Sequence, residues 1–539
     1  MPSNHICFSC GTAWGYDLKS FTPTVQITSG VASFDVDQTG NIGRGDKLTY
    51  DTDKVVYLYA KTDAKTWQVV TGIGTDPDDT DGTETVVSIG RTFALLDDAI
   101  GCTDNSDVDS TGIYQRMDDD IGTVPITSVD SESVDLSPDV GGLDAYLWIA
   151  CYDDGGYDEI EGGFQGTGLG CWGWHTGTMA QDSKVYVYAP TGVDPTDDSI
   201  VDANQNQSHE GVVDGGYRIR NPSGYSSTAL LKGSTGTNAY VADITWDGIQ
   251  VSYKVGNWNY LTLVKTDGPY RGSRGDSIDD PRETWNRMLF YLPADCTSKR
   301  GKMFETSGGS FRGGATVQNS LFISDVGDSK SDANAAEYAI YARRSYTDEE
   351  DGRDKYYNNT IWGQFNGRQS AVFLQCSDGG SDGPHATFFT HMVGNVVICT
   401  DQDGDDASFA GTCFDFLSPS HTNDMPGFEN NASNDVTAGT ERGNLNYSSG
   451  VSQDACNFVA GGQAEPNLHI AAGSVLIGGS LGTSDTLDSG GTTGLAVPAL
   501  DFDRQTRPAA ASCIGADELP TAAAAITPHA MHYRGLLST

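Results

Sequence analysis

Three aspartates in one short phrase could bind a cation. Asp401, Asp403 and Asp405 lie in the phrase DQDGDDASF, where Gly404 permits the sharp turn that lets carboxylates converge. The phrase lacks the closing Glu of a twelve-residue Ca²⁺ loop. The sequence therefore leaves two hypotheses: a structural Ca²⁺, Mg²⁺ or Na⁺, or a hydrated loop without a bound ion. It predicts no other cofactor.

Tryptophans in two phrases could bind sugars. Trp172 and Trp174 belong to CWGWH, and Trp362 belongs to NNTIWG. Exposed aromatic rings offer an apolar face and a polar edge, which suits stacking on sugar rings. These three residues are therefore the candidate glycan-binding residues, and packing in the core is the alternative role for each of them.

Paired carboxylates, which glycosidases use as acid and base, do not single out a catalytic site. Asp153 stands beside Asp154, and Asp279 beside Asp280, but a chain with 74 acidic residues contains such pairs by chance. The catalytic residues stay unknown, and the sequence leans towards a protein that is not an enzyme.

The cysteines give little sign of a metal centre. Cys7 and Cys10 form a CxxC motif near His5, yet no second CxxC follows at the spacing of a zinc ribbon. Buried thiols are the favoured interpretation. The total of 11 Cys is odd, so at least one stays free or pairs between chains.

The charge excludes several partners. The formal net charge is −42 and the isoelectric point is about 4.2, so nucleic acid and anionic membrane surfaces would repel the chain. No stretch approaches 18 apolar residues, which argues against membrane insertion, and the N-terminus has no pattern of an export signal. Asp-rich, Lys-poor surfaces stay hydrated in brine, where charges are screened over roughly 3 Å at 1 M salt, which favours a halophilic or marine source.

The elements that must position these residues are predicted to be strands. Alternating polar and apolar residues from Phe21 to about Ile100 predict a small antiparallel β module within residues 1–100, for docking to a particle or oligomerisation. An acidic linker or loop follows at 101–140. Residues 141–519 contain short β phrases such as AYLWIACY and KVYVYAP between long polar loops, and residues 520–539 form a C-terminal tail.

The pattern of residues 141–519 favours a solenoid. Amphipathic helices are almost missing, so a doubly wound sheet does not fit, whereas a parallel β-helix accepts short strands and loops of any length. Asn residues in the phrases VQNS and NNT suit its corners, because Asn tolerates left-handed backbone and its side chain can bond along the stack.

Three passages resemble right-handed parallel β-helix proteins, the pectate-lyase-like repeats of tailed-virus particles and secreted bacterial proteins. They are IACYDDGGYDEI with the coils that follow it, VADITWDGIQVSY, and the terminal ALDFDRQTRPAAASCIGADEL. In the third passage, the resemblance implies a closing segment built on Arg507, Pro508 and the run from Ile514 to Glu518. The resemblance implies an all-β fold: a small N-terminal β domain followed by a right-handed parallel β-helix with long loops.

The resemblance and the charge together imply a structural surface protein of a tailed virus with a halophilic or marine host, which lies on the virion surface, extracellular after release, and attaches to the host through cell-envelope glycans. A tail spike, a fibre and a capsid turret fit equally well. Its expected partners are a host-envelope glycan or glycoprotein, other virion proteins and further copies of itself. A polysaccharide lyase or glycoside hydrolase on the same scaffold is the alternative, and a secreted or cell-surface adhesin is the third hypothesis.

Overall fold

The structure is a computed structural model. It describes residues 4–100, 134–136, 143–159, 169–170, 174–175, 184–221, 229–232, 243–253, 261–266, 283–293, 301–308, 315–325, 338–345, 354–365, 370–377, 390–400, 412–416, 428–440, 442–460, 467–480, 498–509 and 512–518.

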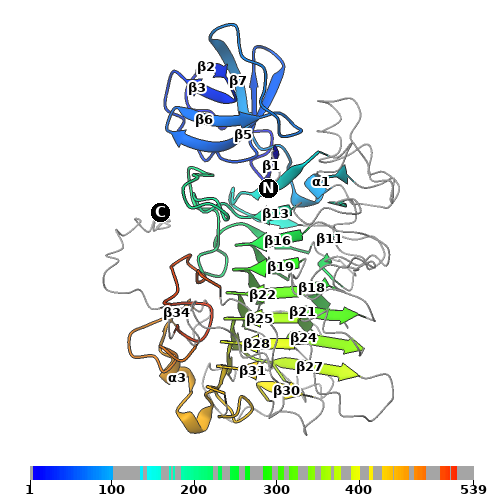
Figure 1. Ribbon diagram of the computed structural model, residues 1–539, viewed down its shortest axis with the longest axis vertical. Coiled ribbons are helices and arrows are strands. Elements are labelled where there is room, and N and C mark those ends of the chain that lie inside the picture. The colour runs from blue at the N-terminus through cyan, green and yellow to red at the C-terminus, as the bar shows by residue number, and fades with distance from the viewer. Residues whose placement is uncertain are drawn as a thin grey trace, which may run out of the picture.

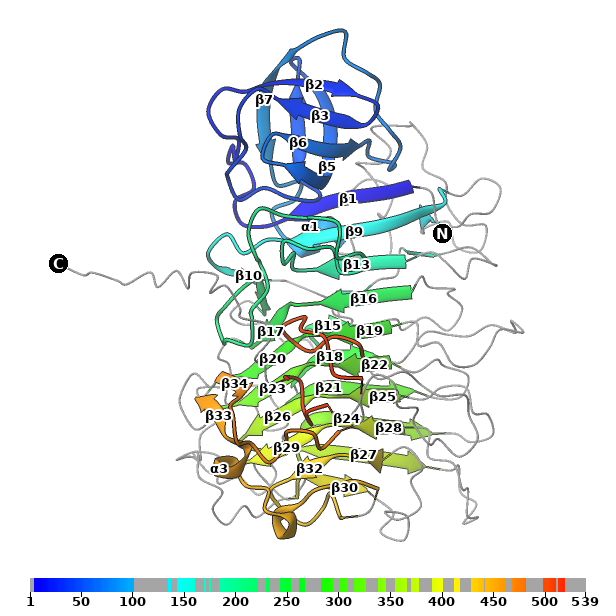
Figure 2. The ribbon, with the colours of Figure 1, turned by 60° about the vertical axis from the view of Figure 1, so that its left-hand side comes forward.

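The described residues are almost all β, and most strands belong to three parallel sheets (Figures 1 and 2). The nine-stranded sheet contains β1 (Asn4–Cys10), β9 (Ala145–Cys151), β13 (Lys184–Tyr188), β16 (Asp243–Asp247), β19 (Glu283–Asn286), β22 (Ala315–Gln318), β25 (Asp354–Tyr357), β28 (Thr390–Val393) and β31 (Phe428–Glu429). The eight-stranded sheet contains β10 (Tyr157–Glu159), β14 (Arg218–Arg220), β17 (Gln250–Ser252), β20 (Leu289–Leu292), β23 (Leu321–Ser324), β26 (Thr360–Gly363), β29 (Val396–Cys399) and β32 (Ala432–Ser433). The seven-stranded sheet contains β11 (Leu169–Gly170), β15 (Leu231–Lys232), β18 (Leu261–Thr266), β21 (Gly301–Gly308), β24 (Tyr338–Ser345), β27 (Val372–Ser377) and β30 (Phe414–Phe416).

The chain visits the three sheets in turn. From β9 onwards, and leaving out the short strand β12, which pairs with β8 (Val134–Asp135), each successive group of three strands adds one strand to each sheet, a unit that we call a circuit. Parallel pairing places equivalent residues of neighbouring circuits side by side, and apolar residues recur at the inward positions. In the eight-stranded sheet the inward column is Ile219, Val251, Phe290, Phe322, Ile361 and Val397, all fully buried in one continuous core. Each circuit thus buries its neighbour's apolar face as well as its own.

The corners between the nine- and eight-stranded sheets are built on left-handed backbone. Asn319 and Asn358 have φ of 50° and 51°, and Gly394 occupies the same place one circuit further on with φ of 69°. Asn and Gly adopt this conformation at least cost, so the residue types suit the turn.

Four buried asparagines bond along the stack beside these corners. They are Asn359, Asn395, Asn431 and Asn444. The side-chain amide of each asparagine donates to a main-chain carbonyl oxygen. The main-chain N–H of each of the first three donates to Oδ1 of the next asparagine in the ladder. Asn359 Nδ2 also lies 2.9 Å from Asn395 Oδ1, which in turn lies 36 residues further along the chain. This asparagine ladder confirms that Asn in the NNT phrase bonds along the stack.

A closed six-stranded barrel precedes most of the stack. It consists of β2 (Thr24–Thr28), β3 (Val31–Phe34), β4 (Lys47–Tyr50), β5 (Lys54–Asp63), β6 (Thr66–Val70) and β7 (Glu84–Gly90), all paired antiparallel. Alternation such as TVQIT sends Val25 and Ile27 into a core of its own around Trp67. The first strand, β1, does not belong to the barrel, because it pairs with β9 in the nine-stranded sheet.

The barrel lies at one end of the stack (Figure 2). Buried ion pairs fasten it to the first circuits. Arg91, at the end of β7, contacts Asp46 of the barrel at 2.7 Å and Asp154 of the first circuit at 2.9 Å. Arg44 contacts Asp194 at 2.5 Å and lies over the Trp148 ring at 4.4 Å. Because these groups are almost fully buried, separating barrel from stack would leave unpaired charges.

Helical structure is scarce among the residues that the structure describes. The described residues contain α1 (Leu96–Ile100), α3 (Gln453–Cys456) and the short 3₁₀ turn Tyr447–Ser449. Ser452 caps α3 by accepting a hydrogen bond from the N–H of Ala455 at 3.1 Å. Across the described part of the chain, no helix has the length and apolar character needed to cross a membrane.

After the last circuit the chain turns back and covers the outer face of the eight-stranded sheet. The short antiparallel pair β33 (Phe458–Ala460) and β34 (Asn467–Ile470) and residues 498–509 and 512–518 lie along the side of the stack in Figure 2. They enclose a second core that joins outward residues of the sheet to residues of this return path, such as Ile323, Ile398, Leu468, Phe502 and Ile514. We call the described residues 498–509 and 512–518 the C-terminal segment.

Candidate functional site

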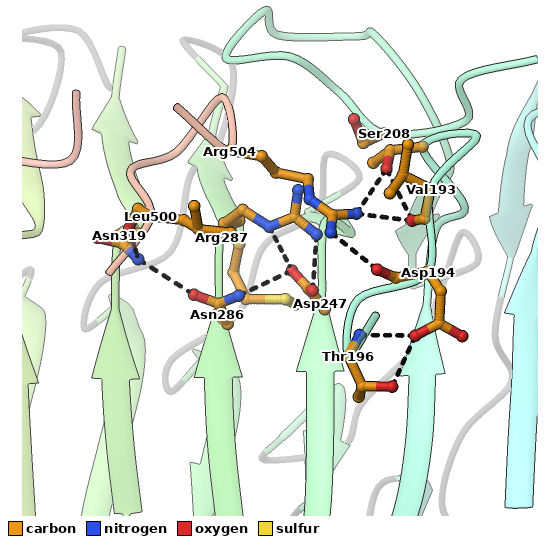
Figure 3. A network of polar contacts seen from close by, with 12 residues as sticks. Val193, Asp194, Thr196, Ser208, Asp247, Asn286, Arg287, Asn319, Leu500 and Arg504 are labelled. Atoms are coloured by element: carbon orange, nitrogen blue, oxygen red, sulfur yellow. Dashed lines mark hydrogen bonds and ion pairs between the residues drawn. The ribbon is translucent and has the colours of Figure 1, made fainter. Parts of the chain in front are cut away.

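A pocket of about 200 Å³ lies where the C-terminal segment meets the corners of the third, fourth and fifth circuits, counted from β9. Its walls are Pro195, Asp247, Asn286, Arg287, Gln318, Asn319, Pro498, Ala499, Leu500, Asp501 and Arg504. Three walls are the consecutive corners that end β16, β19 and β22, so the stack itself sets the spacing of their side chains. Figure 3 shows these side chains converging from neighbouring strands.

One side of the pocket is a fixed ion pair. Arg287 donates Nε to one oxygen of Asp247 at 2.8 Å and Nη2 to the other at 2.6 Å. Both residues are nearly buried, at 5% and 2% exposure, and the two-pronged geometry holds the guanidinium in one plane. Asn286 adds a further donor, since its Nδ2 lies 3.2 Å from Asp247 Oδ1.

Arg504 closes the opposite side (Figure 3). Its guanidinium donates to the carbonyl oxygens of Val193 at 2.6 Å and Asp194 at 2.8 Å, and it pairs with Asp198 at 3.0 Å. Arg504 has a φ of 65°, a left-handed conformation that is costly for a long side chain. The contacts made by its guanidinium tie the C-terminal segment to the loop after β13.

Asp501 lines the pocket but is held as a structural group. Burial, together with the charges of Asp517 and Asp503, raises the pKa of Asp501 to about 7. Its two oxygens accept the main-chain N–H groups of Gln505 at 2.7 Å and Glu518 at 3.1 Å, and the residue is fully buried. A carboxyl group with both oxygens engaged in this way is poorly placed to pass a proton to a ligand.

The carboxamides are the adaptable groups of the pocket. Asn286 Oδ1 accepts hydrogen bonds from Gln318 Nε2 and Asn319 Nδ2, each at 3.3 Å, and Asn319 Nδ2 also reaches the Leu500 carbonyl at 3.0 Å. Carboxamides both donate and accept, and they sit here beside guanidinium and carboxylate groups. This mixture suits a small, polyhydroxylated ligand better than an apolar one.

A second polar surface lies on the outer face of the eight-stranded sheet, at its barrel end. Tyr157 stands under Arg220, whose guanidinium carbon is 4.2 Å from the ring centroid, and its hydroxyl donates to Asp214. Arg220 also pairs with Glu159 of the neighbouring strand. The same face carries apolar residues further along, where the return path covers it, so the sheet changes from a polar to an apolar outer face along its length.

Tyr291 and Asp325 lie near the border of these two regions. The Tyr291 hydroxyl donates to Asp325 Oδ2 at 3.0 Å. Burial raises the pKa of Asp325 to about 6, although the hydrogen bond from Tyr291 works in the opposite direction.

The structure places one of the predicted tryptophans in the interior. Trp362 is 4% exposed, because it points outward from β26 into the second core beneath the return path. It therefore packs against protein and has no ring face open to a sugar, which corrects its assignment as a glycan-binding residue. Trp172 lies outside the described residues, and Trp174 belongs to the short strand β12 (Trp174–His175), whose side chains are also outside them.

Some of the other sequence candidates lie outside the described residues, and others lie within them. Asp401, Asp403 and Asp405, and the pair Asp279 and Asp280, lie outside the described residues.

Among the described candidates, Asp154 is taken up by the ion pair with Arg91, which makes it a structural residue. Cys7 and Cys10 are fully buried, and burial raises the pKa of Cys7 to about 12, which confirms the interpretation as buried thiols.

The resemblance implies a closing segment for the terminal phrase, and in the structure several residues of this phrase contact one another. Arg507 is buried and pairs with Glu518, and its Nη2 lies 3.1 Å from the carbonyl oxygens of Gly515 and Ala516. The segment lies along the side of the stack, where Gly515 N–H donates to the Gly394 carbonyl at 2.7 Å. The pocket residues Arg287 and Arg504 were not foreseen. The sequence signal that could have located Arg287 is the short corner that follows each strand of the nine-stranded sheet, because these corners line the pocket.

Comparison with known proteins returned no relative. No family model, no curated protein and no solved structure matches the chain.

Proposed function

We propose that the three parallel sheets form a right-handed parallel β-helix. The support is the order in which the chain visits the sheets, the left-handed corners and the asparagine ladder. Crossovers between parallel strands of one sheet are right-handed in about 98% of known cases, which gives the expected handedness. Such a scaffold is stiff and elongated, and it exposes the ends of neighbouring circuits as a regular surface.

We infer that this scaffold serves as a structural surface protein of a tailed virus whose host is halophilic or marine. The net charge of −42 supports life in concentrated salt and argues against nucleic acid as a partner. The barrel, fixed to one end by buried ion pairs, is suited to contact other virion proteins while the stack projects outward. Self-association would add avidity for a repetitive target.

The pocket at the corners is the observation that carries the glycan part of this proposal. At about 200 Å³ it is smaller than the pockets of roughly 300–1,000 Å³ that enclose drug-sized ligands, so it suits a single sugar residue of a chain. Arg287, Asn286 and Gln318 offer donors and acceptors for sugar hydroxyls from rigid corners. Attachment to a host-envelope glycan or glycoprotein is the function that this geometry supports best.

Two other functions use the same scaffold. A polysaccharide lyase or glycoside hydrolase needs a carboxyl group or base that can reach the scissile bond, and the engaged oxygens of Asp501 make it a poor candidate. A secreted or cell-surface adhesin would bind the same class of ligand on a cell instead of a particle.

Two experiments separate these functions. Mass spectrometry of purified particles is expected to detect this polypeptide at a constant ratio to the capsid protein, and its consistent lack there would refute the virion assignment. Incubation with envelope polysaccharide in molar salt is expected to give co-elution without shortening of the polymer. Depolymerisation would instead establish the enzyme.

A further inference from the structure

Three side chains outside the pocket meet at the surface of the return path. His469 lies on β34, while Asp503 and Asp517 lie on the two parts of the C-terminal segment. His469 Nδ1 is 3.3 Å from Asp503 Oδ2 and 3.5 Å from Asp517 Oδ1. The three ligand atoms all lie within 4.8 Å of one another.

The ring of His469 is oriented by its other nitrogen. Nε2 lies 3.2 Å from the main-chain carbonyl oxygen of Glu210, and a carbonyl oxygen can only accept, so Nε2 carries a hydrogen. Metal-binding histidines are oriented in the same way, by donating the non-ligating N–H to a carbonyl or carboxylate. Nδ1 therefore faces two carboxylates, and a bare lone pair there would be repelled by both. A positive species, either a proton or a metal ion, must sit at Nδ1.

The distances favour a metal ion over a proton. Charge-assisted hydrogen bonds from a cationic nitrogen to a carboxylate are about 2.7–2.9 Å long, and both contacts of Nδ1 are longer than this. In a tetrahedral site with metal–ligand bonds of about 2.0–2.1 Å, neighbouring ligand atoms lie roughly 3.3–3.4 Å apart. The separations of 3.3 and 3.5 Å are close to that edge length, and the two carboxylate oxygens lie within 4.8 Å of each other.

Asp517 directs a buried oxygen at the same point. It is 4% exposed, and one of its oxygens accepts the main-chain N–H of Ile470 at 2.7 Å. The other, Oδ1, accepts no hydrogen bond from the described residues and points to His469. A buried carboxylate oxygen without a hydrogen bond is costly unless a cation compensates it.

We propose that His469, Asp503 and Asp517 bind one divalent transition-metal ion, with Zn²⁺ as the best match. One imidazole nitrogen with two carboxylate oxygens is a zinc donor set, whereas Ca²⁺ and Mg²⁺ take six or more oxygen ligands. The ion joins β34 to both parts of the C-terminal segment, so its main role is to clamp the return path. Because Asp503 is exposed, the ion can enter from solvent and keep an open fourth position.

The test uses the full chain after treatment with a chelator and measures Zn²⁺ binding by calorimetry and the metal content by mass spectrometry. We expect one Zn²⁺ per chain and a raised melting temperature, with Ca²⁺ and Mg²⁺ giving neither. Asp503→Asn and His469→Gln are expected to weaken Zn²⁺ binding at least tenfold. Asp198→Asn is the matched control, because Asp198 is an exposed aspartate paired with the same segment but outside the cluster, and it should bind like the unmodified chain.

Three results would overturn the proposal: no stoichiometric Zn²⁺ uptake, unchanged affinity in Asp503→Asn, or preference for Ca²⁺. The first would leave a protonated imidazole as the species between the carboxylates. In that state burial disfavours the charge, but the adjacent carboxylates of Asp503 and Asp517 outweigh it and raise the pKa of His469 to about 11. Asp503 is exposed, so its variant tests the site even if His469→Gln fails to fold.

Discussion

Arg507 Nη2 donates a hydrogen bond to Oδ1 of Asn319 at 3.1 Å, although the two residues lie 188 positions apart in the chain. The contact joins the C-terminal segment to a corner of the stack that also forms a wall of the pocket. The return path is therefore part of the candidate binding site, and loosening it should alter both stability and binding.

The first prediction concerns the buried ion pair of Arg507 with Glu518. Replacing Arg507 by Met should destabilise the C-terminal segment by about 3–5 kcal/mol, because Glu518 would keep an uncompensated charge in the interior. Hydrogen exchange should then show faster exchange within 498–518. Lys54→Ala, which removes an exposed ion pair with Asp51, is the control and should leave exchange in that region unchanged. Equal protection from hydrogen exchange in Arg507→Met and the unmodified chain would show that this ion pair does not hold the C-terminal segment in place.

The asparagine ladder gives a second prediction. In Asn395→Ala, the main-chain N–H and the side-chain amide of Asn359 both lose Oδ1 of Asn395 as their acceptor, and both residues are fully buried. Unsatisfied buried groups cost about 1–3 kcal/mol each, so the melting temperature should fall by several degrees. Asn206→Ala on an exposed loop is the comparison and should have little effect. If the asparagine side chains only filled space, Asn395→Leu would leave the melting temperature unchanged. If their hydrogen bonds stabilise the fold, Asn395→Leu should lower it.

Asp325 predicts a specific pH dependence. Its pKa is about 6 in the folded chain and near the ordinary value of 3.8 in the unfolded chain, so between these values the folded state holds the extra proton. Stability should therefore fall as pH rises from about 4 to 6, by at most about 3 kcal/mol from this group. Asp325→Asn keeps an acceptor for Tyr291 and should remove this contribution. The measurement is the difference in melting temperature between the two proteins across that range, and a constant difference would show that burial of Asp325 does not matter.

Local patterns in the sequence predicted much of the repetitive part of the fold. The short strands of residues 141–519 and the corner role of Asn319 and Asn358 follow from residue type and alternation, because neighbouring circuits repeat the same local environment. The antiparallel pairing of the N-terminal β module was also expected, and its closure into a barrel was not.

Long-range contacts could not be predicted in this way. β1 precedes the barrel strands in the chain but pairs with β9, more than 130 residues later, and nothing in its seven residues distinguishes that partner from a nearer one. Trp362 occupies a position of β26 whose side chain points outward from the sheet, yet the return path buries it. The pocket likewise depends on bringing Arg504 to Arg287, a contact between segments that local pattern does not connect.

Attachment to glycan through the pocket is tested most directly by one binding measurement. The unmodified chain and Gln318→Leu are incubated in molar salt with envelope polysaccharide from candidate hosts, and co-elution is followed by size-exclusion chromatography. Gln318 is a half-buried wall residue, so its loss should spare the fold while removing hydrogen bonds to sugar hydroxyls. Gln26→Ala on the exposed face of β2 controls for amide loss elsewhere. We predict co-elution of the unmodified chain and Gln26→Ala, with binding weakened about tenfold in Gln318→Leu. Equal binding by all three proteins, or by none, would contradict attachment through this pocket.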